Sequence, residues 1–218
     1  MASGWTPDQM AAMVAADLPA KSVVNLGIGL PTLVASHVPL GRGILLHSEN
    51  GIIGLGPPPR PGSADEDLID ASKAPATLIA GAAIVDQATS FAVIGGGRLD
   101  IAVLGAFQVA QSGDLANWRV GDVALGSVGG AMDIAIGARR LLVLMRHIDN
   151  DGRPKLVGAC TYPITARRCV KRVYTDLAVV DVTEDGFVVR HRAPGVEQDA
   201  LRRLTEAPLQ FAETQQSS

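Results

Sequence analysis

Cysteine is nearly absent from the sequence. Cys160 and Cys169 are the two cysteines among 218 residues, and no Cys-x-x-Cys pair or His/Cys cluster has the spacing that metal ligands show. The sequence therefore predicts no bound metal. So few cysteines are typical of a protein that works in the reducing cytoplasm.

A membrane span and a secretory signal are absent as well. Residues 22–41 carry no formal charge, but glycines, prolines, Asn25 and His37 interrupt the run, so that it cannot serve as a membrane span. Near the N-terminus, Asp8 stands where a signal peptide needs a positive charge. We expect a cytoplasmic protein that is neither exported nor held in a membrane.

No charge of one sign dominates the chain. The 19 basic and 22 acidic residues give a net charge of −3, which offers no attraction to nucleic acid. The distribution is uneven, because residues 139–192 carry 11 basic and 6 acidic side chains. Apolar runs interrupt this basic segment, which favours solvated strand edges; a cationic surface facing an anionic ligand or a partner chain is the alternative.

The residues that are present predict a packed α/β domain. Hydrophobic residues make up 47% of the chain and charged residues 19%, which excludes a disordered chain. Apolar runs typical of strands alternate with helical patterns, the first of which opens with a capping box at Thr6 and Gln9. We expect a mainly parallel open sheet covered by helices on both faces, with a late antiparallel hairpin.

The expected elements span most of the chain. Strands are predicted at residues 22–26, 44–47, 77–80, 101–104, 140–146, 175–182 and 187–192. Further helices are predicted from Pro31 and at residues 86–94, 131–138 and 197–204. Four prolines and three glycines in residues 54–62 indicate an exposed loop. We expect a single domain over residues 1–206 and a polar C-terminal tail over residues 207–218.

Glu49 is the most informative residue. It is the sole acidic residue between Leu18 and Ala64, and it follows an apolar strand that runs out into Asn50 and Gly51. A carboxylate at the carboxyl end of a parallel strand lies in the crevice where open α/β sheets bind ligands. A glutamate that caps a turn or forms a salt bridge would fit the same position.

Two glycine turns are candidate binding loops. Gly27 and Gly29 follow a strand, with Glu49 twenty residues beyond Gly29, which imitates a dinucleotide-binding fingerprint; Pro31 and Thr32 depart from that pattern. The second turn, at residues 126–133, opens a helix, and its backbone N–H groups could hold an anion or an oxyanion. A tight packing turn explains it equally well.

Other catalytic motifs do not support a competing enzyme class. The sequence contains no G-x-S-x-G, no Walker loop and no His-Glu-x-x-His, which excludes the corresponding hydrolases. His47 lies two residues before Glu49, on the same face of the predicted strand. A hydrogen-bonded core histidine is the favoured interpretation of His47, and a role beside the carboxylate is the alternative.

Six separated blocks of the chain resemble one family. The block around Ser48-Glu49-Asn50-Gly51 resembles the S-E-N-G signature of the beta subunit of the family I 3-oxoacid coenzyme A (CoA) transferases, the succinyl-CoA:3-ketoacid and 3-oxoadipate enzymes. The other blocks occur in the family's order: residues 24–32, 104–107, 113–118, 129–133 and 193–196.

The resemblance implies a reaction and a set of site residues. The glutamate that matches Glu49 attacks an acyl-CoA; this chemistry suits a carboxylate, because it is already ionised at neutral pH and can form an anhydride. By its motif, Gly130 is the expected oxyanion donor. The remaining residues that the resemblance places in the substrate and CoA site are Gly27, Gly29, Asn50, Gly51 and Gly129.

The resemblance also implies substrates and a partner. CoA thioester is expected as substrate and covalent intermediate, without a permanently bound cofactor. This chain matches the beta half alone, so we expect a separate alpha subunit in a hetero-oligomer, with two copies of each. A non-catalytic dinucleotide-binding or interaction module of similar α/β shape is the alternative. The proline-rich residues 57–61 depart from the family pattern and leave the preferred acid open.

Overall fold

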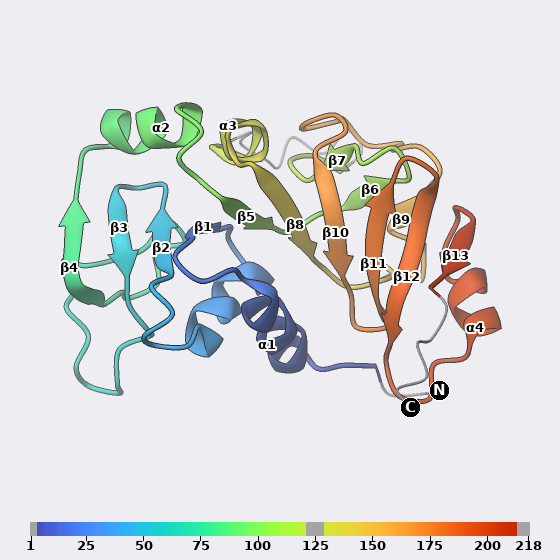
Figure 1. The fold of residues 1–218 in the computed structure, drawn as a ribbon, viewed down its shortest axis with the longest axis horizontal. Helices are drawn as coiled ribbons and strands as arrows, with labels where there is room; N and C mark the ends of the chain where they lie inside the picture. Colours follow the sequence, from blue (N-terminus) through green and yellow to red (C-terminus); the bar gives the residue numbers. More distant parts are fainter. Residues whose placement is uncertain (1–3, 121–128, 213–218) are drawn as a thin grey trace.

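The computed structural model describes residues 4–120 and 129–212, which form an α/β fold built on a ten-stranded sheet (Figure 1). The strand order is β13-β12-β11-β10-β8-β5-β1-β2-β3-β4, and β7, β6 and β9 form a second, three-stranded sheet. The strands are β1 (Val23–Leu26), β2 (Leu45–Ser48), β3 (Ile52–Leu55), β4 (Leu78–Ile84), β5 (Ile101–Leu104), β6 (Gln108–Ala110), β7 (Leu115–Ala116), β8 (Arg140–Leu144), β9 (Leu156–Val157), β10 (Val170–Tyr174), β11 (Ala178–Thr183), β12 (Gly186–Arg192) and β13 (Leu209–Phe211). The helices are α1 (Pro7–Asp17), α2 (Gln87–Gly95), α3 (Ala131–Gly137), α4 (Gln198–Arg203) and the 3-10 helix η1 (Leu30–His37).

The centre of the large sheet is parallel and buried on both faces. Strands β10, β8, β5, β1 and β2 pair in parallel. Along β5, Ile101 and Val103 pack into the hydrophobic cluster that includes α1, whereas Ala102 and Leu104 pack into the cluster that includes α2 and α3. Side chains of a strand alternate between its faces, so a continuous apolar run serves two cores at once. The expected parallel sheet with helices on both faces is confirmed.

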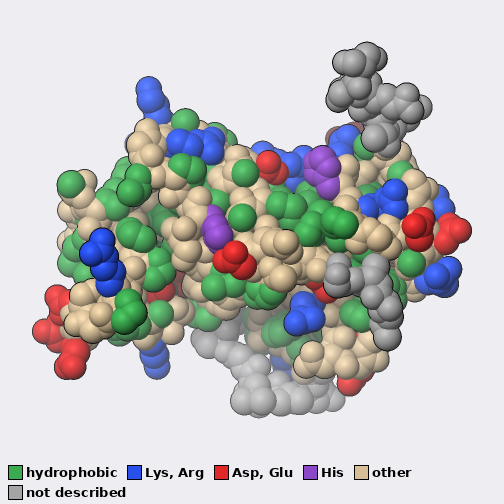
Figure 2. Space-filling view, turned by 90° about the horizontal axis from the view of Figure 1, so that it is seen from below, with side chains coloured by type: hydrophobic (Ala, Val, Ile, Leu, Met, Phe, Trp, Pro, Cys, Tyr) green, Lys and Arg blue, Asp and Glu red, His purple; other side chains and the backbone are tan. Residues whose placement is uncertain are grey.

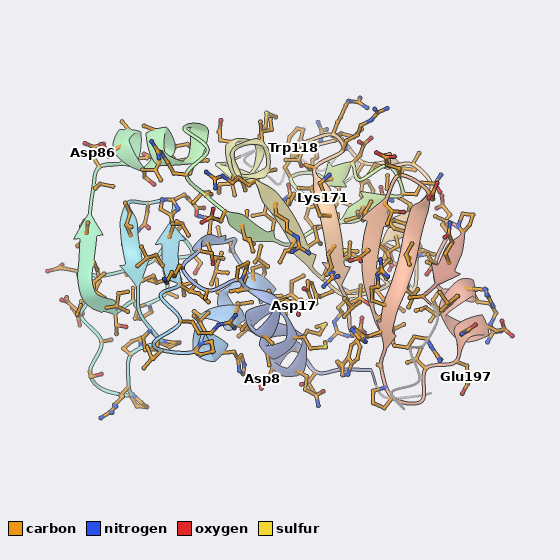
Figure 3. The ribbon with its side chains drawn as sticks, viewed as in Figure 1. Asp8, Asp17, Asp86, Trp118, Lys171 and Glu197 are labelled. Carbon is orange, nitrogen blue, oxygen red and sulfur yellow. The ribbon has the colours of Figure 1, made fainter. Side chains whose placement is uncertain are left out.

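The helices begin where the sequence predicts. Thr6 and Gln9 form the reciprocal capping box of α1. At the start of α2, the Asp86 carboxylate accepts a hydrogen bond from the Thr89 N–H at 2.7 Å (Figure 3). In Figure 1, α1 and η1 lie below the central strands, and α2 and α3 lie above them. Among the described residues, no helix is long and apolar enough to cross a membrane.

Antiparallel strands flank both sides of the parallel centre. The late hairpin of β11 and β12 is present as predicted, with its turn at residues 184–185 and Gly186 as the first residue of β12. An early antiparallel unit, β2-β3-β4, is not among the predicted features. Its strand β3 begins before the loop expected at residues 54–62 and ends inside it, at Leu55. The loop was predicted to start too early because Gly54, a residue type that normally signals a turn, lies within the strand at φ +94°. The loop therefore starts after Leu55, and β4 runs to Ile84 rather than Ala80.

Two further boundaries differ from the prediction. The strand expected at residues 175–182 begins at Ala178, because the Thr175 hydroxyl oxygen accepts hydrogen bonds from the N–H groups of Leu177 and Ala178 and closes a turn there. The residues before that turn form β10, in which the adjacent basic residues Lys171 and Arg172 break the alternation of polar and apolar side chains that identifies a strand. Beyond residue 206, β13 pairs in parallel with β12, so the ordered sheet extends into the expected tail.

An ion-pair network ties α1 to the late strands. Arg172 donates to Asp181 through Nε at 2.5 Å and to Asp17 through Nη1 at 2.8 Å. Tyr174 donates to Asp17 at 2.6 Å, and Arg190 donates to Asp181 at 2.6 Å. Burial raises the pKa of Asp181, but the hydrogen bonds from the two arginines outweigh it and hold that pKa below its usual value. Asp17 is labelled at the end of α1 in Figure 3.

Charge on the outer surface is mixed. Figure 2, which shows the molecule from below the view of Figure 1, has acidic side chains interspersed among Lys and Arg. Part of the basic segment is held in ion pairs within the sheet, such as Arg172 and Arg190 with Asp181. The favoured interpretation of that segment, solvated strand edges, therefore does not describe Arg172, which is half-buried on the inner strand β10, nor the residues that line the cavity described below.

Candidate active site

A cavity of about 930 Å³ lies at the carboxyl ends of the parallel strands. The residue that directly follows each of four neighbouring strands lines it: Gly27 after β1, Glu49 after β2, Gly105 after β5 and Met145 after β8. This edge of an open α/β sheet is where ligands bind, because the strand ends leave room between the connections. The expected crevice is therefore present, and Glu49 is part of its wall.

The Glu49 carboxylate has no partner within the described residues. No hydrogen bond or ion pair joins either oxygen to these residues, and Oε2 is buried. A buried carboxylate oxygen without a donor is unfavourable for folding and is normally paired. The alternative interpretation was a glutamate that caps a turn or forms a salt bridge. Glu49 makes neither contact with the described residues. Glu49 instead lines the cavity with its Oε2 buried and unpaired.

The loop that carries Glu49 is fixed on both sides. Ser48 Oγ accepts a hydrogen bond from the Ala71 N–H at 2.9 Å, and Asn50 Nδ2 donates to the Ile69 carbonyl at 2.8 Å. Gly51 has φ +120°, and a Cβ there would lie 2.0 Å from the Val85 carbonyl oxygen. The segment therefore needs glycine at position 51.

Asn50 and Gly51 do not line the cavity. Both residues act on the loop itself, Asn50 through its hydrogen bond and Gly51 through its close approach to the Val85 backbone just after β4. The structure thus separates them from Glu49, although the three are consecutive in the sequence. Their expected place in the substrate site stays a prediction, and the contacts found give them a different task, that of shaping the turn.

His47 lies beneath the site as a core residue. Asn25 Nδ2 donates to His47 Nδ1 at 3.1 Å, and His47 Nε2 lies 3.0 Å from Ser90 Oγ. Burial lowers the pKa of His47 to about 4, so the imidazole is neutral at physiological pH. The favoured interpretation of a hydrogen-bonded core histidine is confirmed. Asn25 itself is fully buried, and its Oδ1 has no hydrogen-bond partner in the described part of the chain.

The second glycine turn reaches the cavity in part. Residues 126–128 lie outside the described residues, and Gly129 and Ala131 line the cavity. Gly130 is the N-cap of α3 at φ −82°, a conformation open to any residue. A Cβ on Gly130 would nevertheless lie 2.9 Å from Cζ of Phe91, so glycine is favoured there by packing rather than by backbone angle.

The first glycine turn does not form a dinucleotide-binding loop. Gly27 lines the cavity, whereas Gly29, at φ +90°, is exposed and outside its lining. The following element is the 3-10 helix η1, and the Thr32 hydroxyl donates to the Gly29 carbonyl at 2.7 Å. A dinucleotide site needs an α-helix whose N-terminus faces the pyrophosphate. The 3-10 helix at this position removes the physical basis of the dinucleotide interpretation.

The loop after β8 supplies cavity residues that the motifs did not identify. Arg146, Arg153 and Lys155 line the cavity, and all three belong to the basic segment of residues 139–192. Arg153 is bound to Asp149 through Nε at 3.0 Å and also pairs with Asp151. The charge excess of the segment was the available signal, but a count of charges does not tell which side chains face a cavity.

Comparison with known proteins places the chain in a family. The family model of coenzyme A transferase matches residues 8–203. The chain is 49% identical to the B subunit of the 3-oxoadipate CoA-transferase of Acinetobacter baylyi over 94% of both chains. It is 43% identical to the B subunit of the succinyl-CoA:3-ketoacid coenzyme A transferase of Helicobacter pylori, over 84% of this chain and 88% of that one.

A solved structure has the same fold. An acyl-CoA transferase of Escherichia coli O157:H7, determined as a thioester complex with CoA, superposes with a TM-score of 0.74 at 18% identity. The match covers 98% of this chain and 42% of that one, so the chain spans about two-fifths of that structure. The fold and the cavity define an α/β protein with a ligand site at the ends of its parallel strands. The chain belongs to the coenzyme A transferase family, and within it to the B subunits.

Proposed function

We propose that this chain carries the nucleophile of a 3-oxoacid CoA-transferase that moves CoA from an acyl-CoA, with succinyl-CoA as the expected donor, to a 3-oxo acid. The observation that supports this most directly is the Glu49 carboxylate, which lines the cavity and has no partner among the described residues. The substrates are suggested by the names of the relatives in Acinetobacter baylyi and Helicobacter pylori. CoA thioester is then a substrate, and no resident cofactor is required.

The proposed reaction proceeds in two exchanges at Glu49. A carboxylate oxygen attacks the thioester carbonyl, the CoA thiolate leaves, and a mixed anhydride forms. The thiolate then attacks the glutamyl carbonyl, which releases the first acid as a carboxylate and leaves an enzyme thioester of CoA. A second acid reverses both steps and departs as its CoA thioester. A carboxylate can do this without a general base, because it is ionised at neutral pH.

Two glycine turns are proposed to support the reacting carbonyl. Gly130 is the proposed donor of a backbone N–H to the oxyanion, at the start of α3 beside two residues that line the cavity. Gly27 and Gly129 lie in the wall itself, where the lack of side chains leaves room for a thioester. Gly29 is proposed at the outer end of the CoA site, and Asn50 acts through the loop that presents Glu49.

The active enzyme is proposed to contain a separate alpha subunit. The relatives are named as B subunits, which supports a partner chain, and we propose two alpha and two beta subunits in the complex. A cytoplasmic location suits Cys160 and Cys169, whose thiols are free. Burial raises the pKa of each thiol to about 11, so neither is a reactive thiolate.

A trapping experiment tests the proposed covalent step. The complex with the alpha subunit is incubated with succinyl-CoA, and the peptide that contains Glu49 is examined by mass spectrometry. We expect this peptide to gain the mass of a CoA thioester, and Glu49→Gln to abolish the adduct. Glu197→Gln, at an exposed N-cap far along the chain, is the control and should leave it intact (Figure 3). An adduct on another residue would refute the proposed nucleophile.

A further inference from the structure

Two cations in the cavity wall have no ion-pair partner in the described part of the chain. Lys155 is half-buried, Arg146 is exposed, and neither forms a salt bridge or side-chain hydrogen bond with any described residue. Arg153, which lines the same wall, is by contrast neutralised by Asp149 and Asp151. A half-buried ammonium without a direct ion pair is unfavourable, because the charges of Asp149 and Asp176 compensate its desolvation only in part. This part of the cavity wall therefore carries two positive charges that form no ion pair with a described residue.

The position of Lys155 is fixed by the backbone of the loop. Its N–H donates to the His147 carbonyl at 3.1 Å, and a β-bridge joins Ile148 to Pro154 directly before it. His147 is itself buried between Thr175 and Thr205, at 2.9 Å from each hydroxyl. These contacts hold the backbone of Lys155 in place at the edge of the cavity. A cation held in this way can select a ligand by geometry.

The spacing relative to Glu49 limits what the cation can bind. Glu49 follows β2 and the loop of Lys155 follows β8, three strand positions away in the sheet order. Adjacent strands are about 4.8 Å apart, so the two strand ends are separated by roughly 14 Å. Glu49 and Lys155 line the same cavity, and their side chains are long enough to shorten this separation. The gap that is left suits a short acid whose second charged group lies a few carbons from the reacting carboxyl.

We propose that Lys155, assisted by Arg146, binds the remote carboxylate of a dicarboxylic substrate and so makes this subunit selective for diacids over monoacids. The proposal rests on the function proposed above, because the acid must react at Glu49. The chemistry that fits is a carboxylate at the far end of a four- to six-carbon acid, which would accept charge-assisted hydrogen bonds from the ammonium. Lys155 is then a specificity-determining residue.

The charged groups around Lys155 make its protonation a useful second readout. The pKa of Lys155 is lowered to about 8, chiefly by burial and to a smaller extent by Arg146, against the opposing charges of Asp149 and Asp176. Glu206 also lines this cavity. Because the lysine loses its charge as the pH rises through about 8, kcat/KM for a diacid should fall there, whereas kcat/KM for a monoacid should not.

The test compares paired acids on the complex with the alpha subunit. One pair is succinate and butyrate, and the other is 3-oxoadipate and acetoacetate, each used as acceptor from a fixed CoA thioester. We expect Lys155→Met to lower kcat/KM for both diacids by about 10- to 100-fold and to change the monoacid values less than about threefold. Lys155→Arg should restore the diacid preference and move the decline to a pH above about 9.

Two more variants keep the test decisive. Lys171→Met removes an exposed lysine of β10 from the same basic segment and should change neither acid class (Figure 3). Arg146→Met should lower the diacid values severalfold, and it is available if Lys155→Met does not fold, because Arg146 is exposed.

The alternative outcomes are distinct. Equal losses for diacids and monoacids would overturn the proposal. A rise in KM for the CoA thioester with every acid would also overturn it, because the cation would then serve the phosphates of CoA. If the wild-type complex transfers CoA to none of the four acids, the proposed function fails, and the selectivity of Lys155 fails with it. Transfer with an unchanged acid preference in the variants refutes only the role of Lys155.

Discussion

Two half-buried carboxylates of this molecule have opposite surroundings. Asp181, among the late strands, accepts hydrogen bonds from Arg172 and Arg190, and the same Arg172 reaches on to Asp17 of α1. Glu49, at the end of β2, receives no hydrogen bond from any described residue, although its Oε2 is buried. The two groups have the same chemistry and are both half-buried, so their partners distinguish them.

One sheet thus holds two carboxylates in contrasting surroundings. A carboxylate surrounded by guanidinium groups has its lone pairs engaged and its charge compensated, so it holds elements together. A carboxylate without donors keeps its lone pairs available for a reaction, at a cost in folding free energy that the rest of the sheet must offset. Substitution of Asp181 should therefore lower stability, whereas substitution of Glu49 should lower turnover.

The largest effect is expected at Glu49. Glu49→Gln keeps the shape but removes the negative charge that attacks the thioester, so turnover of the complex should fall by about three or more orders of magnitude. Melting of the variant should stay at or above that of the wild type, because an uncompensated buried charge has been removed. Steady-state kinetics and thermal melts measure both. A well-folded variant with activity within about tenfold of wild type would contradict the assignment.

The next largest effect is expected at Gly130. Gly130→Val should lower kcat by about a hundredfold or more, with a much smaller change in CoA affinity, if the backbone N–H meets the oxyanion. The contact with Phe91 complicates this, because any side chain at position 130 meets its ring. Adding Phe91→Leu relieves that contact. If melting temperature and kcat recover together in the double variant, Gly130 is a packing glycine; if only the melting temperature recovers, it acts in the reaction.

A moderate loss of stability is expected at Asp181. Asp181→Asn should lower the free energy of unfolding by about 2 kcal/mol at pH 7, because it removes the negative charge that accepts three hydrogen bonds from Arg172 and Arg190. The pKa of Asp181 is lowered in the folded chain, so its stabilisation is present above about pH 4 and is lost as the pH falls through the folded value. Urea unfolding at pH 7 and at about pH 3 should show the difference between variant and wild type shrinking. A constant difference would argue against charge as its origin.

The smallest effect is expected at Asn50. Asn50→Ala removes the exposed hydrogen bond to the Ile69 carbonyl, so the free energy of unfolding should change by less than about 1 kcal/mol and turnover by a few-fold. Kinetics with the alpha subunit present provide the measurement. A loss of about a hundredfold or more would show that Asn50 contacts the substrate, as the resemblance implies, and does more than support the loop.

The sequence predicted the centre of the sheet better than its flanks. The residues of β1, β5 and β8 form largely apolar runs, which are typical of strands buried on both faces. By contrast, β10 has two adjacent basic residues between apolar ones, and β3 contains Gly54 in a left-handed conformation, so neither resembles a regular strand. Tertiary pairing, which the local pattern does not contain, decides both.

The site was predicted in the same uneven way. Glu49 could be found because a lone acid after an apolar strand is conspicuous and its motif is specific. Lys155 could not be found in this way. It stands out because its side chain lines the cavity and forms no hydrogen bond or ion pair with a described residue, and such contacts are known only from the folded chain. The role of Gly51 became clear only from the Val85 carbonyl, which two strands and a loop separate from it in the sequence.

The placement of four wall residues directly after four strands has a consequence for engineering new acid preferences. Positions after strand ends can change with little disturbance of the sheet, yet they are not equally permissive. At Gly27 a Cβ would lie 2.8 Å from Leu104 Cδ2, whereas nothing lies within 4 Å of a Cβ at Gly105. Randomising Gly105 would therefore diversify the cavity, while Gly27 and Met145, whose side chain is 2% exposed in the hydrophobic core, stay fixed as part of the scaffold.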